Sequence, residues 1–187
     1  MSALPIAAPL DIKAASSANS IAVGFVKNPD DSYEFVGPLV ADIEKFFGLN
    51  LVDELTFFGP SAKAGEIFEI PVSAPDSSTD RIFLVAVGDQ GGAALRAAGA
   101  SVGRKVRGKN LSVYSACAVK EFKAHAISMS LGAWMWNLKT DKKKEVPKLL
   151  SKINNNAANR LVINRTFLLS IKDQIIYSIN CIHTIVK

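Results

Sequence analysis

The sequence predicts an α/β protein in which a mixed β-sheet is flanked by helices. The main observation is the stretch RIFLVAVGDQGG, where an apolar run from Ile82 to Val87 leads directly into a glycine turn. An apolar run without polar alternation indicates a strand buried on both faces, as in a sheet that helices cover. The rest of residues 81–140 reads as helix, strand and helix, which is the order of a crossover unit with parallel strands.

The residues before position 81 supply the elements that precede this unit. Residues 1–19 are rich in Ala, Ser and Pro, and we expect a flexible N-terminus that is frayed or loosely paired at an edge. Residues 20–26 predict a strand, which the turn-forming sequence NPDD at 28–31 ends. The other predicted elements are a helix over 39–47 that Gly48 ends, a short helix over 51–58 and a strand over 67–72.

The predicted crossover unit continues in three segments. A small-residue helix follows the glycine turn with AALRAAGASVGRKVRG, and the strand NLSVYSACAV covers residues 110–119. The last helix, EFKAHAISMSLGAWMWNLKT, spans residues 121–140. Because two predicted strands precede this unit, we expect a mixed sheet with helices on both of its faces.

A change in composition predicts a domain boundary near Thr140. The charged run KTDKKKEVPK suits an exposed connector, and residues 151–187 contain eight Ile and six Asn but only two Ala. We therefore divide the chain into the N-terminus over 1–19, a domain over 20–140, and a connector with an amphipathic tail over 141–187. Helical spacing in the tail predicts a linker-like helix, although its β-branched side chains leave a strand as the alternative. The apolar stripe consists of Leu168, Ile171, Ile175, Ile179 and Ile182.

Charge is distributed unevenly along the chain. Residues 1–100 hold 6 Lys and Arg against 13 Asp and Glu, whereas residues 101–187 hold 16 against 4. Such asymmetry fits acidic and basic surfaces that complement each other within one fold or across an oligomer. The alternative is an anionic partner for the basic half.

Cysteine usage and hydropathy indicate where the protein works. Cys117 and Cys181 are the only cysteines, and their apolar contexts favour reduced core residues over a disulfide scaffold. The first twenty residues lack the basic and apolar regions of a signal peptide, and no apolar run approaches the length of a membrane span. We therefore expect a cytoplasmic protein without a membrane partner.

Several motifs resemble those of leucyl aminopeptidases over residues 20–140. LGAWMW, followed by a lysine, resembles the LGAYRF signature that closes the N-terminal domain of that family, and FEIPVS and FLVAVGDQ fit the same order of elements. Trp134 and Trp136 stand at the aromatic positions, while Met135 replaces the arginine. The resemblance implies a macrodomain-like α/β fold without catalytic residues, which in the family helps to assemble a hexamer and shapes access to the active site.

The residues that the family needs for catalysis are not found in this sequence. The resemblance implies two divalent metals, zinc or manganese, held by carboxylates and a lysine, with an NTDAEGR segment that supplies ligands. No NTDAEGR occurs, and the acidic residues after Ser101 are too scattered for a two-metal site. They are Glu121, Asp141, Glu145 and Asp173. We therefore expect no catalytic residue, metal ligand or cofactor in this chain.

Gly88, Gly91 and Gly92 form the one candidate ligand loop, because they lie between a predicted strand and a predicted helix. Backbone amides at such a position bind phosphates in other proteins, and macrodomains use this neighbourhood for ADP-ribose. The alternative is a tight turn with close helix packing. His125 and His183 have no Cys, Asp or Glu at ligand spacing, so we interpret both as core or surface residues.

Basic and aromatic side chains near the predicted helix ends have structural explanations as well as functional ones. Lysines and arginines at the end of a helix interact favourably with its dipole, whereas nucleic-acid binding through them would be salt-sensitive and sequence-blind. We do not expect a nucleic-acid partner. The aromatic pair at 134 and 136 fits a plug against the sheet better than a stacking platform. The basic residues are Arg104, Lys105, Arg107 and Lys109, continued by Lys142, Lys143 and Lys144.

The expected function is that of a non-catalytic N-terminal domain of a leucyl aminopeptidase, a truncated product with an assembly role. We expect self-association through residues 165–187, as a dimer, and a separate aminopeptidase catalytic chain is a further partner that fits. The alternative function is a free-standing macrodomain-like module that binds a nucleotide or polyanion at residues 88–92.

Overall fold

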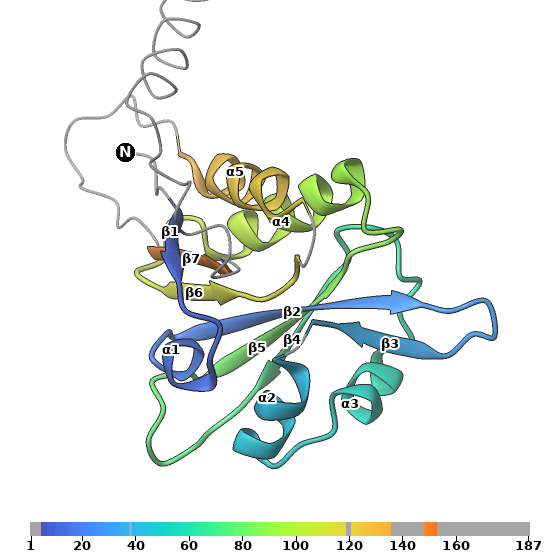
Figure 1. The fold of residues 1–187 in the computed structure, drawn as a ribbon, viewed down its shortest axis with the longest axis horizontal. Helices are drawn as coiled ribbons and strands as arrows, with labels where there is room; N and C mark the ends of the chain where they lie inside the picture. The colour runs from blue at the N-terminus through green and yellow to red at the C-terminus, as the bar shows by residue number, and fades with distance from the viewer. Residues whose placement is uncertain (1–4, 38, 119–120, 136–147, 153–187) are drawn as a thin grey trace, which may run out of the picture. The chain divides into compact units, whose positions relative to one another are not determined.

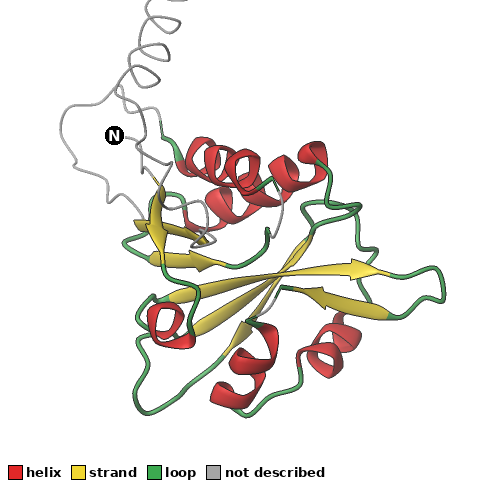
Figure 2. Cartoon of the chain, viewed as in Figure 1, coloured by secondary structure: helices red, strands yellow, loops and turns green. Residues whose placement is uncertain are grey.

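The computed structural model describes residues 5–37, 39–118, 121–135 and 148–152. Helices are interspersed with strands along these residues (Figures 1 and 2). The strands are β1 (Pro5–Ala8), β2 (Ser20–Lys27), β3 (Tyr33–Val36), β4 (Ile67–Pro71), β5 (Arg81–Ala86), β6 (Ser112–Ser115) and β7 (Lys148–Lys152). The helices are α1 (Ile12–Ser16), α2 (Val40–Phe47), α3 (Leu51–Phe58), α4 (Gly92–Val106) and α5 (Phe122–Ala133).

The described strands form one seven-stranded mixed sheet, which confirms the predicted fold class. Its order is β1-β7-β6-β2-β5-β4, and β3 pairs with β2. The strands from β1 to β5 in this order run parallel, whereas β4 pairs with β5 and β3 pairs with β2 in antiparallel fashion. The crossover from β5 through α4 to β6 passes over β2, which lies between them in the sheet.

Strand β2 is central because it has partners along its whole length. Residues 20–22 pair with β6 and residues 24–27 pair with β3, while β5 follows residues 20–25 along the other edge. Gly24 lies where β6 ends and β3 begins. A Cβ atom at Gly24 would lie 2.9 Å from the carbonyl oxygen of Cys117, so the missing side chain leaves room for the chain that leaves β6.

Helices cover both faces of the sheet, with α1, α2 and α3 on one face and α4 and α5 on the other (Figure 1). Side chains of β5 alternate between the two cores, because successive residues of a strand point to opposite faces. Ile82 and Leu84 pack with the first group of helices, and Phe83 and Val85 pack with the second. The uninterrupted apolar run of this strand is therefore explained, as predicted, by helices that bury both of its faces.

The pair α4 and α5 packs at very close range. A Cβ atom at Gly99 would clash with the carbonyl oxygen of His125, and one at Gly103 would lie 2.7 Å from the amide nitrogen of Ala133. A Cβ atom at Gly132 would in turn clash with the carbonyl oxygen of Ala100. The glycines therefore let the two helix backbones approach each other, and small residues are what such a contact requires.

The N-terminal segment differs from the flexible N-terminus expected over 1–19. Strand β1 lies at the edge of the sheet, but it pairs in parallel with β7, and helix α1 follows it. The carboxylate of Asp11 caps α1 by accepting the Ala14 amide at 2.6 Å. The Tyr114 hydroxyl donates to the carbonyl oxygen of Pro9 at 2.7 Å, so a strand far along the chain fixes this segment.

The C-terminal part of the sheet also differs from the predicted boundaries. The sheet takes β7 from residues 148–152, within the connector that the sequence predicts after Thr140. Helix α5 ends at Ala133 rather than at 140, because Trp134 is extended with φ −66° and ψ 138°. Strand β6 covers only residues 112–115 of the predicted 110–119. The predicted tail helix lies outside the described residues.

None of the helices in the described ranges has the length and apolar character that a bilayer-spanning segment needs.

Candidate functional site

The candidate phosphate loop connects β5 to α4. Gly88 (φ 53°) and Gln90 (φ 57°) are both in the left-handed region, and Gly91 is the extended N-cap residue of α4. The Gly91 amide donates to the Asp89 carboxylate at 2.9 Å. The loop is therefore a tight turn in which an aspartate side chain accepts a hydrogen bond from the backbone two residues later.

The contacts of this loop bear on phosphate binding. A Cβ atom at Gly88 would lie 3.2 Å from the Cβ of Ala64 and 3.3 Å from that of Ala94, so its open side is already occupied. The Gly91 amide is engaged by a carboxylate, whose negative charge disfavours an anion at the same place. These contacts favour the tight-turn alternative, and phosphate binding at residues 88–92 stays a prediction.

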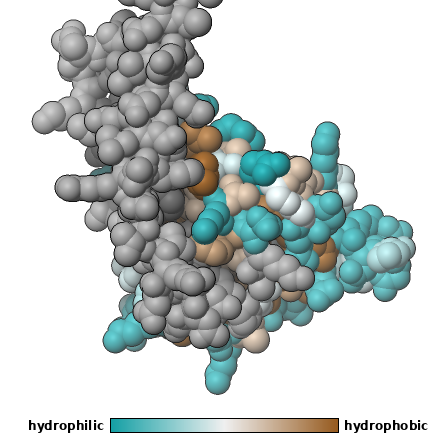
Figure 3. Space-filling model, turned by 45° about the horizontal axis from the view of Figure 1, so that its top comes forward, coloured by the Kyte–Doolittle hydropathy of each residue, from teal (hydrophilic) through white to brown (hydrophobic). Residues whose placement is uncertain are grey.

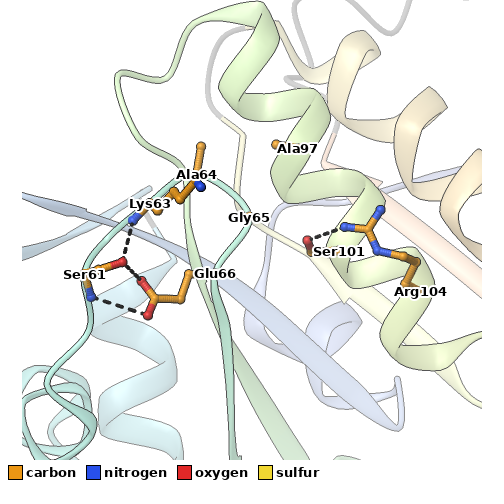
Figure 4. A pocket seen from close by; sticks show the side chains of 8 residues that line it. All are labelled: Ser61, Lys63, Ala64, Gly65, Glu66, Ala97, Ser101 and Arg104. Carbon is orange, nitrogen blue, oxygen red and sulfur yellow. Dashed lines mark hydrogen bonds between the residues drawn. The ribbon is translucent and has the colours of Figure 1, made fainter.

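A hollow of about 400 Å³ lies beside this loop, between the segment that precedes β4 and the outer side of α4 (Figure 4). Nothing in the sequence pattern predicts it, because its two walls are far apart along the chain. Its volume falls within the range of small-molecule sites, about 300–1,000 Å³. The lining residues are Ser61, Lys63, Ala64, Gly65, Glu66, Ala97, Ser101 and Arg104.

Gly65 sets the distance between the two walls of the hollow. Its φ of 88° is in the left-handed region, and a Cβ atom there would lie 3.0 Å from both the Ala97 carbonyl oxygen and the Ser101 hydroxyl. The Gly65 amide donates to the carbonyl oxygen of Ala86 at 2.8 Å, which fixes the segment to the end of β5. Glycine is therefore required here both for its conformation and for its size.

Polar side chains on each wall are held by local hydrogen bonds. On one wall the Glu66 carboxylate accepts from the Ser61 hydroxyl at 2.9 Å and from the Ser61 amide at 3.4 Å. On the other wall the Arg104 guanidinium donates to the Ser101 hydroxyl at 2.9 Å. Figure 4 shows Glu66 turned toward Ser61, on the side of the hollow away from Arg104.

The charges around α4 fall into paired and unpaired groups. The Lys105 ammonium lies 3.1 Å from the Glu69 carboxylate, which also binds Arg81 at 2.9 Å. Arg104 and Lys63, in contrast, have no carboxylate partner within the described residues. The adjacent residues Arg104 and Lys105, both of which the sequence singled out, therefore differ, since Lys105 has a carboxylate partner and Arg104 does not. Lys142, Lys143 and Lys144 lie outside the described residues.

His125 is a core residue, which is one of the two placements, core or surface, that the sequence leaves open. Its Nδ1 lies 3.2 Å from the Leu95 carbonyl oxygen, and its Nε2 lies 2.8 Å from the Ser115 hydroxyl. A carbonyl only accepts, so Nδ1 carries the proton and Nε2 accepts from Ser115. Burial lowers the pKa of His125 to about 4, because the charged ring would lose its hydration. This serine–histidine pair has no solvent access, and His183 lies outside the described residues.

Cys117 lies two residues after the end of β6, the strand that holds Ser115, and its side chain is buried. Burial raises the pKa of its thiol to about 12, since the thiolate would be desolvated. The thiol is therefore protonated at neutral pH and serves as a small core side chain, as predicted. Cys181 lies outside the described residues. No group of three His, Cys, Asp or Glu side chains among the described residues is placed to hold a metal ion.

Within the described residues, Trp134 is not buried in the way that the predicted plug requires. Trp134 is 42% exposed, and Leu131 and Ile127, one and two turns earlier on α5, are 68% and 44% exposed. Figure 3 shows hydrophobic surface among hydrophilic surface on the side where α4 and α5 come forward. Met135 lies near Gly108, and Trp136 is outside the described residues.

Comparisons with known proteins find similar solved structures but no similar family or curated sequence. No protein-family model matches the sequence, and no curated protein matches it. A variant of tomato leucine aminopeptidase matches with a TM-score of 0.53 and 15% identity, over 81% of this chain and 33% of that chain. The chain thus spans about a third of the tomato enzyme, and at this identity the likeness concerns the fold.

A second solved protein gives weaker matches. The bottromycin maturation enzyme BotP matches with a TM-score of 0.47 and 16% identity, over 74% of this chain and 28% of that chain. Its complex with Mn matches with a TM-score of 0.48 and 16% identity, over 76% and 28% of the two chains. Of these structures, the tomato enzyme has a TM-score above 0.5, and its likeness supports the α/β fold.

Proposed function

We propose that this chain acts as a non-catalytic domain equivalent to the N-terminal part of a leucyl aminopeptidase, with a role in assembly. The observation that carries the proposal is the fold match to tomato leucine aminopeptidase over 81% of this chain. The motif LGAWMW adds to it, since the resembled LGAYRF signature closes that part of the family's sequence. The whole enzyme's activity is not carried over with the fold.

The chemistry of the described side chains supports a non-catalytic role. In the described part of the chain, Ser115 and His125 form the one hydrogen-bonded serine–histidine pair, and both are closed to solvent. A nucleophile has to reach its substrate, so this pair serves packing. The sequence adds that NTDAEGR is absent and that carboxylates after Ser101 are scattered.

The proposal predicts that the purified chain does not hydrolyse leucine p-nitroanilide with added manganese or zinc. The measurement is release of p-nitroaniline over a range of chain concentrations, with an authentic leucine aminopeptidase as the positive control. The expected rate equals that of buffer with metal. Hydrolysis that stays with the chain through purification and rises in proportion to its concentration would contradict the proposal.

A further inference from the structure

The hollow between the segment 61–66 and α4 combines three properties of a ligand site. It has a suitable volume, it is walled by residues from distant parts of the sequence, and its charged groups do not neutralise one another. Its place also fits, because Ala64 on its wall lies against the turn at Gly88, which follows the carboxyl end of β5. In open α/β sheets, ligands bind outside the carboxyl ends of the strands.

The charge of the hollow selects an anion. Lys63 and Arg104 contribute two positive charges, and neither has a carboxylate partner in the described ranges. The single acidic side chain on the wall, Glu66, directs both carboxylate oxygens to Ser61. A phosphate monoester carries about −1.5 to −2 charges at neutral pH, so it matches two cations better than a carboxylate does.

The donors in the hollow fit the geometry of a phosphate group. Arg104 has five N–H donors, of which one is used by Ser101, and its side chain is held in place by that bond. The Ser101 hydroxyl accepts from Arg104 and keeps its own proton for an acceptor. Gly65 and Ala97 add little to the lining, since one has no side chain and the other only a methyl group. We propose that this hollow binds a phosphorylated small molecule through Arg104, Lys63 and Ser101.

This site is distinct from the glycine loop of residues 88–92 and goes beyond the proposed assembly role. The two sites share a boundary at Ala64 and Gly88, but Lys63, Ser101 and Arg104 line the hollow, whereas the cation beside the loop is Arg96, next to Gly92. A helix-end explanation of Arg104 accounts for its charge near the C-terminus of α4. It does not account for the unpaired Lys63 on the opposite wall.

The test is a titration of the full chain with glycerol phosphate, followed through backbone amide shifts by NMR. Saturable shifts are expected at the amides of Gly65 and Ser101 in the millimolar range or below. Arg104→Gln is expected to weaken binding about tenfold, since a hydrogen bond between charged groups contributes about that factor. Arg96→Gln is the matched control, because Arg96 is exposed on the same helix but lies near Gly92. The control is expected to bind as the natural chain does.

Two further arms sharpen the result. Glu66→Gln removes the negative charge of the wall while keeping an acceptor for Ser61, so phosphate should bind more tightly. Acetate should bind more weakly than glycerol phosphate. The proposal is wrong if no shift saturates, if Arg104→Gln and Arg96→Gln weaken binding equally, if acetate binds as tightly, or if the shifts fall at residues 88–92. The absence of binding would leave the aminopeptidase assay unaffected.

Discussion

His125 shows how one buried titratable residue affects the stability of the whole fold. Its ring is neutral in the core, and both ring nitrogens are hydrogen-bonded. The pKa of His125 is lowered to about 4 from an ordinary value near 6.5. The unfolded chain therefore binds a proton on this residue more readily than the folded chain does. Stability from the neutral ring is fully present above the ordinary value and is lost as pH falls through the window down to the folded pKa.

We predict that lowering the pH from about 7 to about 5 costs about 2 kcal/mol of unfolding free energy through His125. The measurement is urea unfolding at both pH values for the natural chain and for His125→Gln. The variant is less stable at neutral pH but cannot gain this proton, so its pH dependence should be smaller by that amount. Equal pH dependence in the two chains would show that His125 does not titrate as a buried group.

The candidate site illustrates what residue patterns reveal and what they hide. The glycine loop was predicted because its residues are neighbours in sequence, next to an apolar strand. The hollow was not, because Lys63 and Arg104 become neighbours only when the segment before β4 packs on α4. The engagement of the Gly91 amide by Asp89 also depends on the conformation of the turn, which glycine spacing does not specify. The left-handed conformation of Gly65 also could not be predicted from its neighbours in the sequence.

At the scale of elements, the pairing of α4 and α5 depends on missing side chains. A Cβ atom at Gly103 would meet backbone atoms of Met129, Gly132 and Ala133 in α5. Both helices also contribute to the core on this face of the sheet, through Val102 and Met129. Helix pairs are usually separated by about 8–10 Å between axes, a distance that larger side chains set. The close contact makes the two helices a single packing layer over the sheet.

We predict that Gly103→Ala destabilises the chain by about 1–3 kcal/mol, because the added methyl group overpacks a rigid contact. Gly92→Ala is the control, since its Cβ would meet only the flexible end of Arg96, at 3.3 Å. That change should be neutral or stabilise by up to about 1 kcal/mol through helix propensity. Urea unfolding of the three chains decides the matter. A loss at Gly92 as large as the loss at Gly103 would refute the packing explanation.

The elements that the sequence predicted are those with strong local signals. Apolar runs identified β2 and β5, and glycine stops identified the ends of α2 and α3, where Gly48 and Gly59 are left-handed. The missed elements β1, α1, β3 and β7 are each five residues or shorter. Strand β7 has a defined place only because β1 and β6 lie on either side of it, which is information from distant segments. Helix α5 ends before Trp134, although the sequence predicts that the helix continues to Thr140.

At the scale of the whole molecule, the uneven charge is used partly inside the fold. Glu69 from the acidic half binds Lys105 from the basic half, and Arg81 joins the same cluster. These contacts agree with the interpretation that the two halves complement each other. Of the described basic residues at 101–118, Lys105 is the one that forms such an ion pair.

We predict that the full chain self-associates as a dimer through the apolar stripe of residues 165–187. An isoleucine left in water forgoes about 1.5–3 kcal/mol of burial, so the stripe favours a covered state. Analytical ultracentrifugation should show that Ile175→Asp shifts the chain toward monomer. Asn180→Asp is the control, because it adds the same charge opposite the stripe on the helix that the sequence predicts. If all three chains sediment as the same species, the stripe is not the interface.

The parallel pairing of β1 with β7 has a consequence for how the protein is made. Strand β1 is complete at Ala8, but its partner over Lys148–Lys152 is among the last described residues to be synthesised. At about 5–20 residues per second, the ribosome adds those residues many seconds later. During translation the first strand therefore waits without a partner, and a chaperone that binds nascent chains has that interval in which to bind it. The strand that is translated first therefore cannot complete its place in the sheet until β7 has been made.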